Sequence, residues 1–221
     1  MNGFPIGSGM RRLTSYSKLG TGNYLMNEVR LGEITESCTT EFTAQSYELY
    51  GLPPLGSLVK TKNGDTEIFG VVYNAATGSI EPGRKPIARG KEETAEEAIF
   101  QSNPQLLKLL RSEFAVLLVG HKHDERMYWY LPPQPDHIHG FVYQCTPQDV
   151  KEFSQSFAFF NILINAHTSI PNEELIAASL REMSLVHEDR RAFLISAGKE
   201  LAALLGSQYQ QLRAILGRLQ I

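Results

Sequence analysis

A change of hydrophobic period near Thr146 is the feature that most constrains this chain of 221 residues. From about Val29 to Cys145, short apolar runs alternate with polar turns, as in a series of short β-strands. After Thr146, apolar residues recur at the three- and four-residue spacing of helices. Many short strands in one run favour a closed barrel, because closure removes exposed strand edges. We therefore predict the α+β class: mainly a closed β-barrel, followed by a C-terminal α-helical segment.

We predict three segments along the chain. Residues 1–26 are rich in Gly and Ser, carry basic charges without acidic ones and lack the apolar stretch of a secretory signal. We expect this N-terminal segment to be disordered, or to be an over-extension of a native protein that begins at Met26. A transit peptide is the remaining alternative. Residues 27–146 are predicted to form the β-barrel domain, and residues 147–221 the α-helical domain.

Composition and charge exclude some classes of function. The formal net charge of −3 creates no overall field that attracts nucleic acid or a membrane surface. Cys38 and Cys145 stand far apart and in no paired motif, which favours a reducing, cytoplasmic location. No apolar run approaches the ~20 residues of a membrane-spanning helix. We predict no cofactor.

The turns and helices can be placed more closely. In the hairpin over residues 57–74, Asn63-Gly64 is predicted to form a type I′ turn. Two helices are expected to interrupt the strands, a surface helix over 91–101 and a second that begins with Asn103 as cap and Pro104 in its first turn. The tail is predicted to form helices over residues 146–166, 171–183, 187–206 and 207–221, the first capped by Thr146 and the last with a stripe of Tyr209, Leu212, Ile215 and Leu219.

The stretch "GSIEPGRKP", Gly78 to Pro86, has the glycine spacing of a nucleotide-binding phosphate loop. The Lys and Ser/Thr of that motif are replaced by Arg84 and Lys85. Nothing would then reach the phosphates or hold magnesium. Pro86 also disfavours a helix directly after Gly83. We interpret the stretch as a loop between strands, or as part of a basic contact site.

The order of several short pieces resembles the HAS-barrel, the domain shared by HerA-type helicases and rotary ATP synthases. These pieces are Gly32-Glu33-Ile34, Phe42, "LPPLGSLV" and "FGVVYN", and the resemblance covers about Val29 to Cys145. "RKPIARGK", "LPPQPDHIHG" and the helical end are similar to short stand-alone HAS-barrel proteins of photosynthetic bacteria. In the family the barrel packs against neighbouring barrels in a ring and can hold partner proteins. Nucleotide chemistry belongs to a separate motor domain, whereas this barrel is followed by residues that read as helix.

Two groups of residues are candidates for contact with a partner protein or nucleic acid. The first is a run of four cations, Arg84, Lys85, Arg89 and Lys91. Cations can hold phosphates or an acidic protein surface. Glu92, Glu93, Glu96 and Glu97 follow directly and cancel this charge locally, which also fits a solvated loop and helix. The second is the pair Tyr128 and Tyr130, which alternation in "MYWYLPP" places on one face, where tyrosines can stack on bases or lie under the tail.

Catalytic and metal sites are weaker candidates. His121, His123, His137 and His139 form two H-x-H pairs, and such a pair in a strand suits zinc. "GHKHDER" reads as a turn, however, where side chains diverge, so we predict no metal site. Cys145 and His139 could act as nucleophile and base, but Cys145 ends an apolar strand, where a small buried cysteine is ordinary.

We therefore expect a non-catalytic binding or assembly module. The resemblance implies a protein partner, and a ring-shaped ATPase of the HerA or ATP synthase type is the candidate. The tail is expected either to complete the core or to join copies of the chain into a homo-oligomer. The alternatives are a nucleic-acid-binding accessory protein, which the net charge disfavours, and an enzyme with an unrecognised site.

Overall fold

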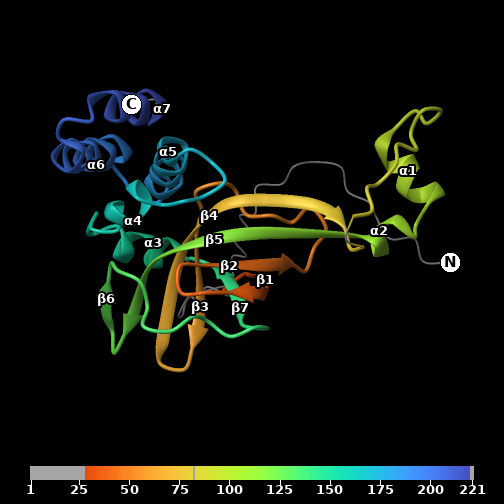
Figure 1. Ribbon diagram of the computed structural model, residues 1–221, viewed down its shortest axis with the longest axis horizontal. Helices are drawn as coiled ribbons and strands as arrows, with labels where there is room; N and C mark the ends of the chain where they lie inside the picture. The colour runs from red at the N-terminus through yellow and green to blue at the C-terminus, as the bar shows by residue number, and fades with distance from the viewer. Residues whose placement is uncertain (1–27, 82, 220–221) are drawn as a thin grey trace, which may run out of the picture.

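The structure, a computed structural model, describes residues 28–81 and 83–219. The predicted N-terminal segment, residues 1–26, lies outside this range. Within it, the chain forms a β-barrel followed by helices, so the predicted α+β class is confirmed (Figure 1). No helix of the described residues is both long and apolar enough to cross a bilayer.

The described strands form one antiparallel sheet that closes on itself. They are β1 (Arg30–Ser37), β2 (Glu41–Ser46), β3 (Leu58–Asn63), β4 (Thr66–Ser79), β5 (Leu110–His123), β6 (Arg126–Tyr128) and β7 (Phe141–Gln144). Their order is β2-β1-β7-β3-β4-β5-β6, and β2 also pairs with β5. Six strands therefore close a barrel, and β6 extends the sheet beyond β5.

Alternate residues of β5 belong to two different apolar clusters. Phe114, Val116 and Leu118 pack in one cluster, and Leu117 and Val119 in the other. Because neighbouring side chains of a strand point to opposite faces, the first cluster fills the barrel and the second lies on its outside. The barrel thus has an inner core and an outer apolar face that must be covered.

The tail helices cover this outer face. They are α3 (Pro147–Phe153), α4 (Phe160–Ile164), α5 (Asn172–Ser184), α6 (Arg190–Leu205) and α7 (Tyr209–Leu219). Phe160, Leu175 and Ile215 share the outer cluster with barrel residues. Gly56 has φ +86° and lies directly against the backbone of α5, where a Cβ atom would collide with it. The tail therefore completes the core, while the predicted domain boundary at Thr146 stays a prediction.

The predicted first tail helix is wrong in its length. Thr146 does cap α3 with Pro147 at its start, but α3 ends at Phe153 and a separate α4 begins at Phe160. Between them, the Ser154 hydroxyl lies 2.9 Å from His187 Nε2 and 3.4 Å from the Lys151 carbonyl. Side-chain bonds of this kind compete with helix continuation.

Two other predictions of detail need correction. The β3–β4 turn is centred on Gly64 and Asp65, one residue later than predicted, because Asn63 pairs with Thr66. Positive φ at Gly64, the first central residue, is the pattern of a type II′ turn rather than type I′. In α7, Ile215 and Leu219 are buried as expected, but Tyr209 at the head of the predicted stripe is exposed.

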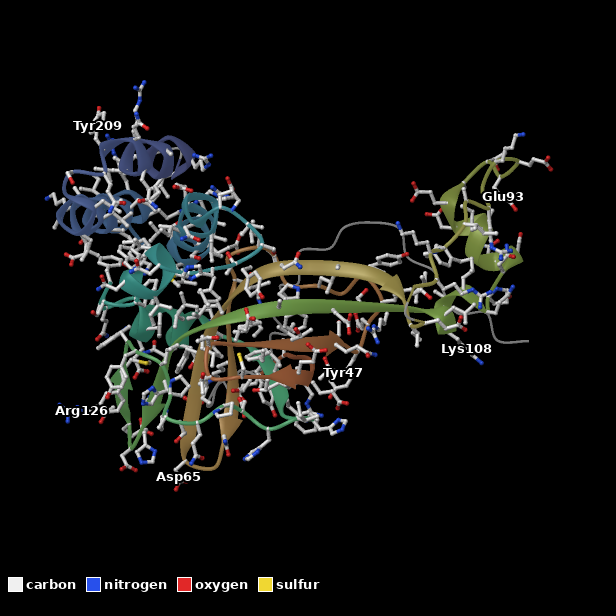
Figure 2. All side chains as sticks on the ribbon, viewed as in Figure 1. Tyr47, Asp65, Glu93, Lys108, Arg126 and Tyr209 are labelled. Carbon is white, nitrogen blue, oxygen red and sulfur yellow. The ribbon has the colours of Figure 1, made fainter. Side chains whose placement is uncertain are left out.

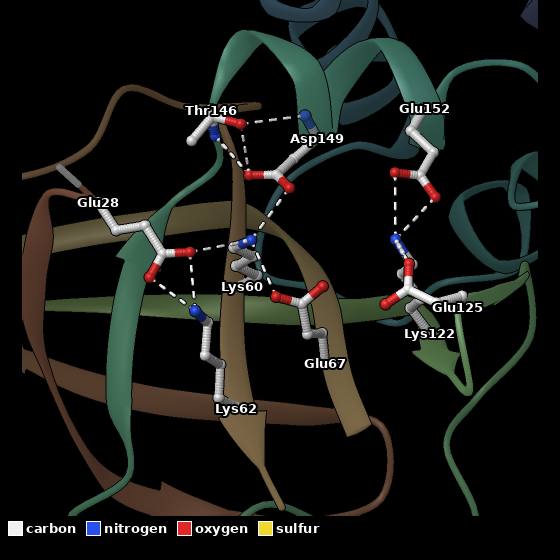
Figure 3. A network of polar contacts seen from close by, with 9 residues as sticks. All are labelled: Glu28, Lys60, Lys62, Glu67, Lys122, Glu125, Thr146, Asp149 and Glu152. Atoms are coloured by element: carbon white, nitrogen blue, oxygen red, sulfur yellow. Dashed lines mark hydrogen bonds and ion pairs between the residues drawn. The ribbon is translucent and has the colours of Figure 1, made fainter. Parts of the chain in front are cut away.

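A buried lysine joins α3 to the barrel (Figure 3). Lys60 Nζ in β3 lies 3.0 Å from Glu67 Oε1 of β4, 3.0 Å from Asp149 Oδ1 of α3 and 3.3 Å from Glu28 Oε1. Asp149 also accepts hydrogen bonds from the backbone and hydroxyl of Thr146, which completes a capping box. The helix cap and the barrel thus share one carboxylate.

The charges of this cluster stabilise one another. Burial opposes the charge of Lys60, but hydrogen bonds with Glu67 and Asp149 outweigh it and raise the pKa of the ammonium. Burial likewise opposes ionisation of Asp149, and hydrogen bonds from Thr146 and then Lys60 lower the pKa of its carboxyl. A second lysine, Lys122 of β5, contacts α3 one turn later through Glu152, at 3.0 Å.

We predict that Lys60→Met destabilises the fold by about 3 kcal/mol, because it leaves half-buried carboxylates facing one another without their cation. Lys62→Met is the matched control: it removes a more exposed ammonium with a single carboxylate partner, Glu28, and should cost less than about 1 kcal/mol. Urea denaturation measures both. Equal losses for the two variants would contradict the role given to Lys60.

We also predict an acid-sensitive contact at His187, between α5 and α6. Its ring stacks on Phe193 with centroids 4.1 Å apart. Burial, and then the charge of Lys151, lower the pKa of the imidazole. Folding is therefore favoured by the neutral ring, and this contribution is lost as pH falls through and below the ordinary pKa of 6.5.

The test is the free energy of unfolding of the wild type and of His187→Asn at about pH 7 and about pH 5. The wild type should lose more stability on acidification than the variant. An identical loss in both proteins would show that His187 does not contribute.

Candidate docking site

The longest hairpin of the sheet extends beyond the barrel. Residues 77–79 of β4 pair with residues 110–112 of β5, past the last β3 partner of β4 at Val71 and past Glu113, the last residue of β5 that pairs with β2. This two-stranded ribbon carries residues 80–109, here called the arm, at the end of the molecule away from α5–α7 (Figure 1). The sequence pattern predicted a loop and helices here, but not the length of the ribbon.

The arm contains two short helices with no buried residue. Helix α1 is Glu96–Ser102 and helix α2 is Leu106–Leu109. Both are shorter than predicted, and α2 is preceded by Gln105 rather than capped by Asn103. Helices of this length are not stable alone in water. Large apolar side chains are exposed in the arm, with Ile87 at 72% and Leu107 at 53%. Such surfaces mark contacts with other molecules.

Three of the four predicted cations line a groove at the base of the arm. Arg84, Lys85 and Arg89 surround a cavity of about 130 Å³, whose apolar walls are Ile87, Leu106, Leu109 and Leu110. Arg84 pairs with Glu81 at 2.8 Å, and Arg89 donates to Asn103 Oδ1 at 3.3 Å. Lys91, the fourth cation, is exposed and outside the groove lining. Glu81, the partner of Arg84, also lines the groove, so the groove combines apolar residues with three cations and one carboxylate and is basic in sum.

The two predicted contact tyrosines lie elsewhere. Tyr128 stacks on the imidazole of His121 and Tyr130 meets it edge-on, with ring centroids 5.0 and 5.3 Å away. Arg126, beside them in sequence, lies at the opposite end of the molecule from Glu93 of the arm (Figure 2). Met127 and Trp129, on the other face of this segment, pack against the tail cluster. The structure thus separates the cations and the tyrosines into two places.

The four histidines do not converge. The turn predicted in "GHKHDER" lies at Asp124 and Glu125, whereas His121 and His123 lie before it in β5, so their predicted place in the turn is wrong. His121 is buried, while His123 bonds to Thr66 and His139 to Glu33 Oε1 at 3.1 Å. In the part of the chain that the structure describes, no three His, Cys, Asp or Glu side chains are grouped to hold a metal ion.

Cys145 is buried against the tail, as expected for a structural cysteine. Complete burial raises the pKa of its thiol well above the ordinary value, which disfavours the reactive thiolate. Cys38 is exposed, and hydrogen bonding to Thr40 lowers its pKa.

We predict that a thiol reagent such as DTNB labels Cys38 alone in the native protein, because Cys145 is buried as a neutral thiol. The Cys38→Ser variant should give no fast reaction until denaturant is added. Absorbance of the released thiolate measures both steps. Fast labelling of the native Cys38→Ser protein would reopen the nucleophile hypothesis for Cys145.

Neither the models of known protein families nor the curated proteins contain a match to this sequence. The description of the barrel and the arm therefore rests on the structure and not on a related protein. Membership of the HAS-barrel family rests on the residues quoted for the resemblance and stays an expectation.

Proposed function

We propose that this chain is a non-catalytic binding or assembly module of the cytosol, which docks on a protein partner through the arm. The observation that supports this most is the arm itself, since its helices bury no side chain, and Leu107 in α2 and Ile87 in the preceding loop are exposed to solvent. Exposed apolar residues gathered on one segment favour contact with another molecule. The barrel and tail then serve as the rigid support.

The candidate partner is a ring-shaped ATPase of the HerA or ATP synthase type. This follows from the HAS-barrel resemblance, in which the barrel is the module that meets neighbouring barrels and partner proteins. A fold does not determine a function, so the partner class must be tested directly. The closed barrel of the structure is compatible with this class and does not identify it.

Nucleic-acid binding is the second candidate function. The exposed cations Arg84, Lys85 and Arg89 favour it, because they could contact phosphates. Their separation from Tyr128 and Tyr130 weighs against a combined phosphate-and-stacking site. Binding of a labelled oligonucleotide that weakens steeply with salt would favour this candidate over protein docking.

The test is affinity capture from native extract with two baits, the intact chain and a variant without the arm. In the variant, Asn-Gly replaces residues 81–108 and joins Ile80 to Leu109, which already pair through a 2.9 Å backbone hydrogen bond. This dipeptide suits a two-residue hairpin turn. We expect subunits of a ring ATPase with the intact bait and not with the variant.

Equal recovery with both baits would show that the arm is not the docking element. Recovery of no ATPase with the intact bait would contradict the proposed partner class. A melting curve of the variant close to that of the intact chain is the control for folding.

A further inference from the structure

The arm carries as many cations as carboxylates, and the two kinds of charge are concentrated in different parts of it. Its five cations are Arg84, Lys85, Arg89, Lys91 and Lys108, and its five carboxylates are Glu81, Glu92, Glu93, Glu96 and Glu97. Three of the cations line the groove at the base, where β4, β5 and α2 meet. Glu96 and Glu97 belong to α1, and Figure 2 shows Glu93 at the far end of the arm and Lys108 near its base. The base is therefore basic and the tip acidic.

Most of these cations and carboxylates form no ion pair with one another in the part of the chain that the structure describes. Among the described residues of the arm, Arg84–Glu81 is the sole ion pair. No α1 residue lines the basic groove. Lys85, Glu96 and Glu97 are all exposed and in no ion pair with the described residues. The cations and carboxylates that are adjacent in the sequence are thus mostly not paired in the fold.

Helix α1 has the chemistry that the groove would accept. Glu96 and Glu97 precede Phe100 by four and three residues, so the three side chains share one helical face. Ile99 faces the arm itself, since its side chain lies against Gly90. The half-buried Phe100 flanked by carboxylates is complementary to a groove that has apolar residues and an excess of cations, in the manner of a helix bound in a groove.

We propose that the arms of two copies of this chain pair antiparallel about a two-fold axis, with the acidic face of α1 of each copy in the basic groove of the other. This proposal rests on the proposed role of the arm as the docking element, and it names a second copy as the partner there. The contact is isologous: each arm supplies both halves of it, so one interaction forms twice.

A second copy is favoured by the charges and by the position of the arm. The same arm offers the groove and a helix complementary to it, which a foreign partner would not require. The arm projects from the end of the ribbon, far from the tail helices (Figure 1). Two arms can therefore pair at this end while the barrels and tails of the two copies stay apart.

The test uses charge reversal in two complementary variants of the full chain. Lys85→Glu/Arg89→Glu gives the arm a net negative charge, and Glu96→Lys/Glu97→Lys gives it a net positive charge. The matched control, Lys199→Glu/Arg213→Glu, changes two exposed cations of α6 and α7 by the same net charge as the first variant. Size-exclusion chromatography with light scattering at about 100 μM detects even a weak dimer.

We expect the wild type and the control to be dimers that weaken on the order of tenfold from about 50 mM to about 500 mM salt, because the contact is between exposed charges. Each arm variant alone should be monomeric, since both contacts become repulsive. An equimolar mixture of the two arm variants should restore a dimer, because both contacts are then attractive again. Native mass spectrometry of the mixture, with one variant isotopically labelled, identifies the heterodimer.

A monomeric wild type, dimeric arm variants, or a mixture that stays monomeric would each overturn the proposal. Purified chain alone is used, so a failure here leaves docking on an ATPase untouched. Conversely, a dimer that behaves as described would persist even if the capture from extract recovered no ATPase.

Discussion

The buried ammonium of Lys60 is the interaction on which the rest of the structure depends. A lysine inside a strand is unfavourable unless its charge is paired. Three carboxylates meet that demand, and they come from Glu28, the neighbouring strand and α3. Asp149 serves this lysine and the cap of α3 with the same carboxylate. The start of the tail is thus fixed at one point on the barrel, and the helices that follow are positioned to cover its outer apolar face.

This attachment divides the molecule into two unlike ends. At one end, barrel and tail share a continuous apolar cluster, so that neither would keep its buried surface without the other. At the other, β4 and β5 continue as a ribbon whose helices bury nothing. Stability is therefore concentrated where α3 meets the barrel, and a contact at the arm can form or break without disturbing it. This division between a stable end and a binding end suits a module that binds a partner without losing its own fold.

The sequence predicted features that depend on local chemistry and missed those that depend on distant partners. The cap at Thr146 and Pro147 was correct, because capping uses neighbouring residues. His121 was placed in a turn, since nothing local shows that Tyr128 and Tyr130 enclose its ring. The end of β4, "NAATGS", has few β-branched or aromatic residues, so the pairing with β5 that makes it a strand could not be read. The one signal for Lys60 in the sequence is its position as a charge between Val59 and Thr61, in a strand whose first four residues are buried.

The candidate docking site shows the same limit in its charges. Along the sequence, Arg84 to Lys91 and Glu92 to Glu97 are adjacent, and their sum is near zero. A net charge near zero argues against electrostatic attraction at long range, because a distant charged molecule responds to the net charge of the segment. It does not argue against a contact at close range, where screening leaves only neighbours within about 10 Å to interact. The fold places Arg84, Lys85 and Arg89 around a groove, and Glu96 and Glu97 on a helix outside it. A neutral segment can therefore be strongly polar in space, and complementary to a copy of itself.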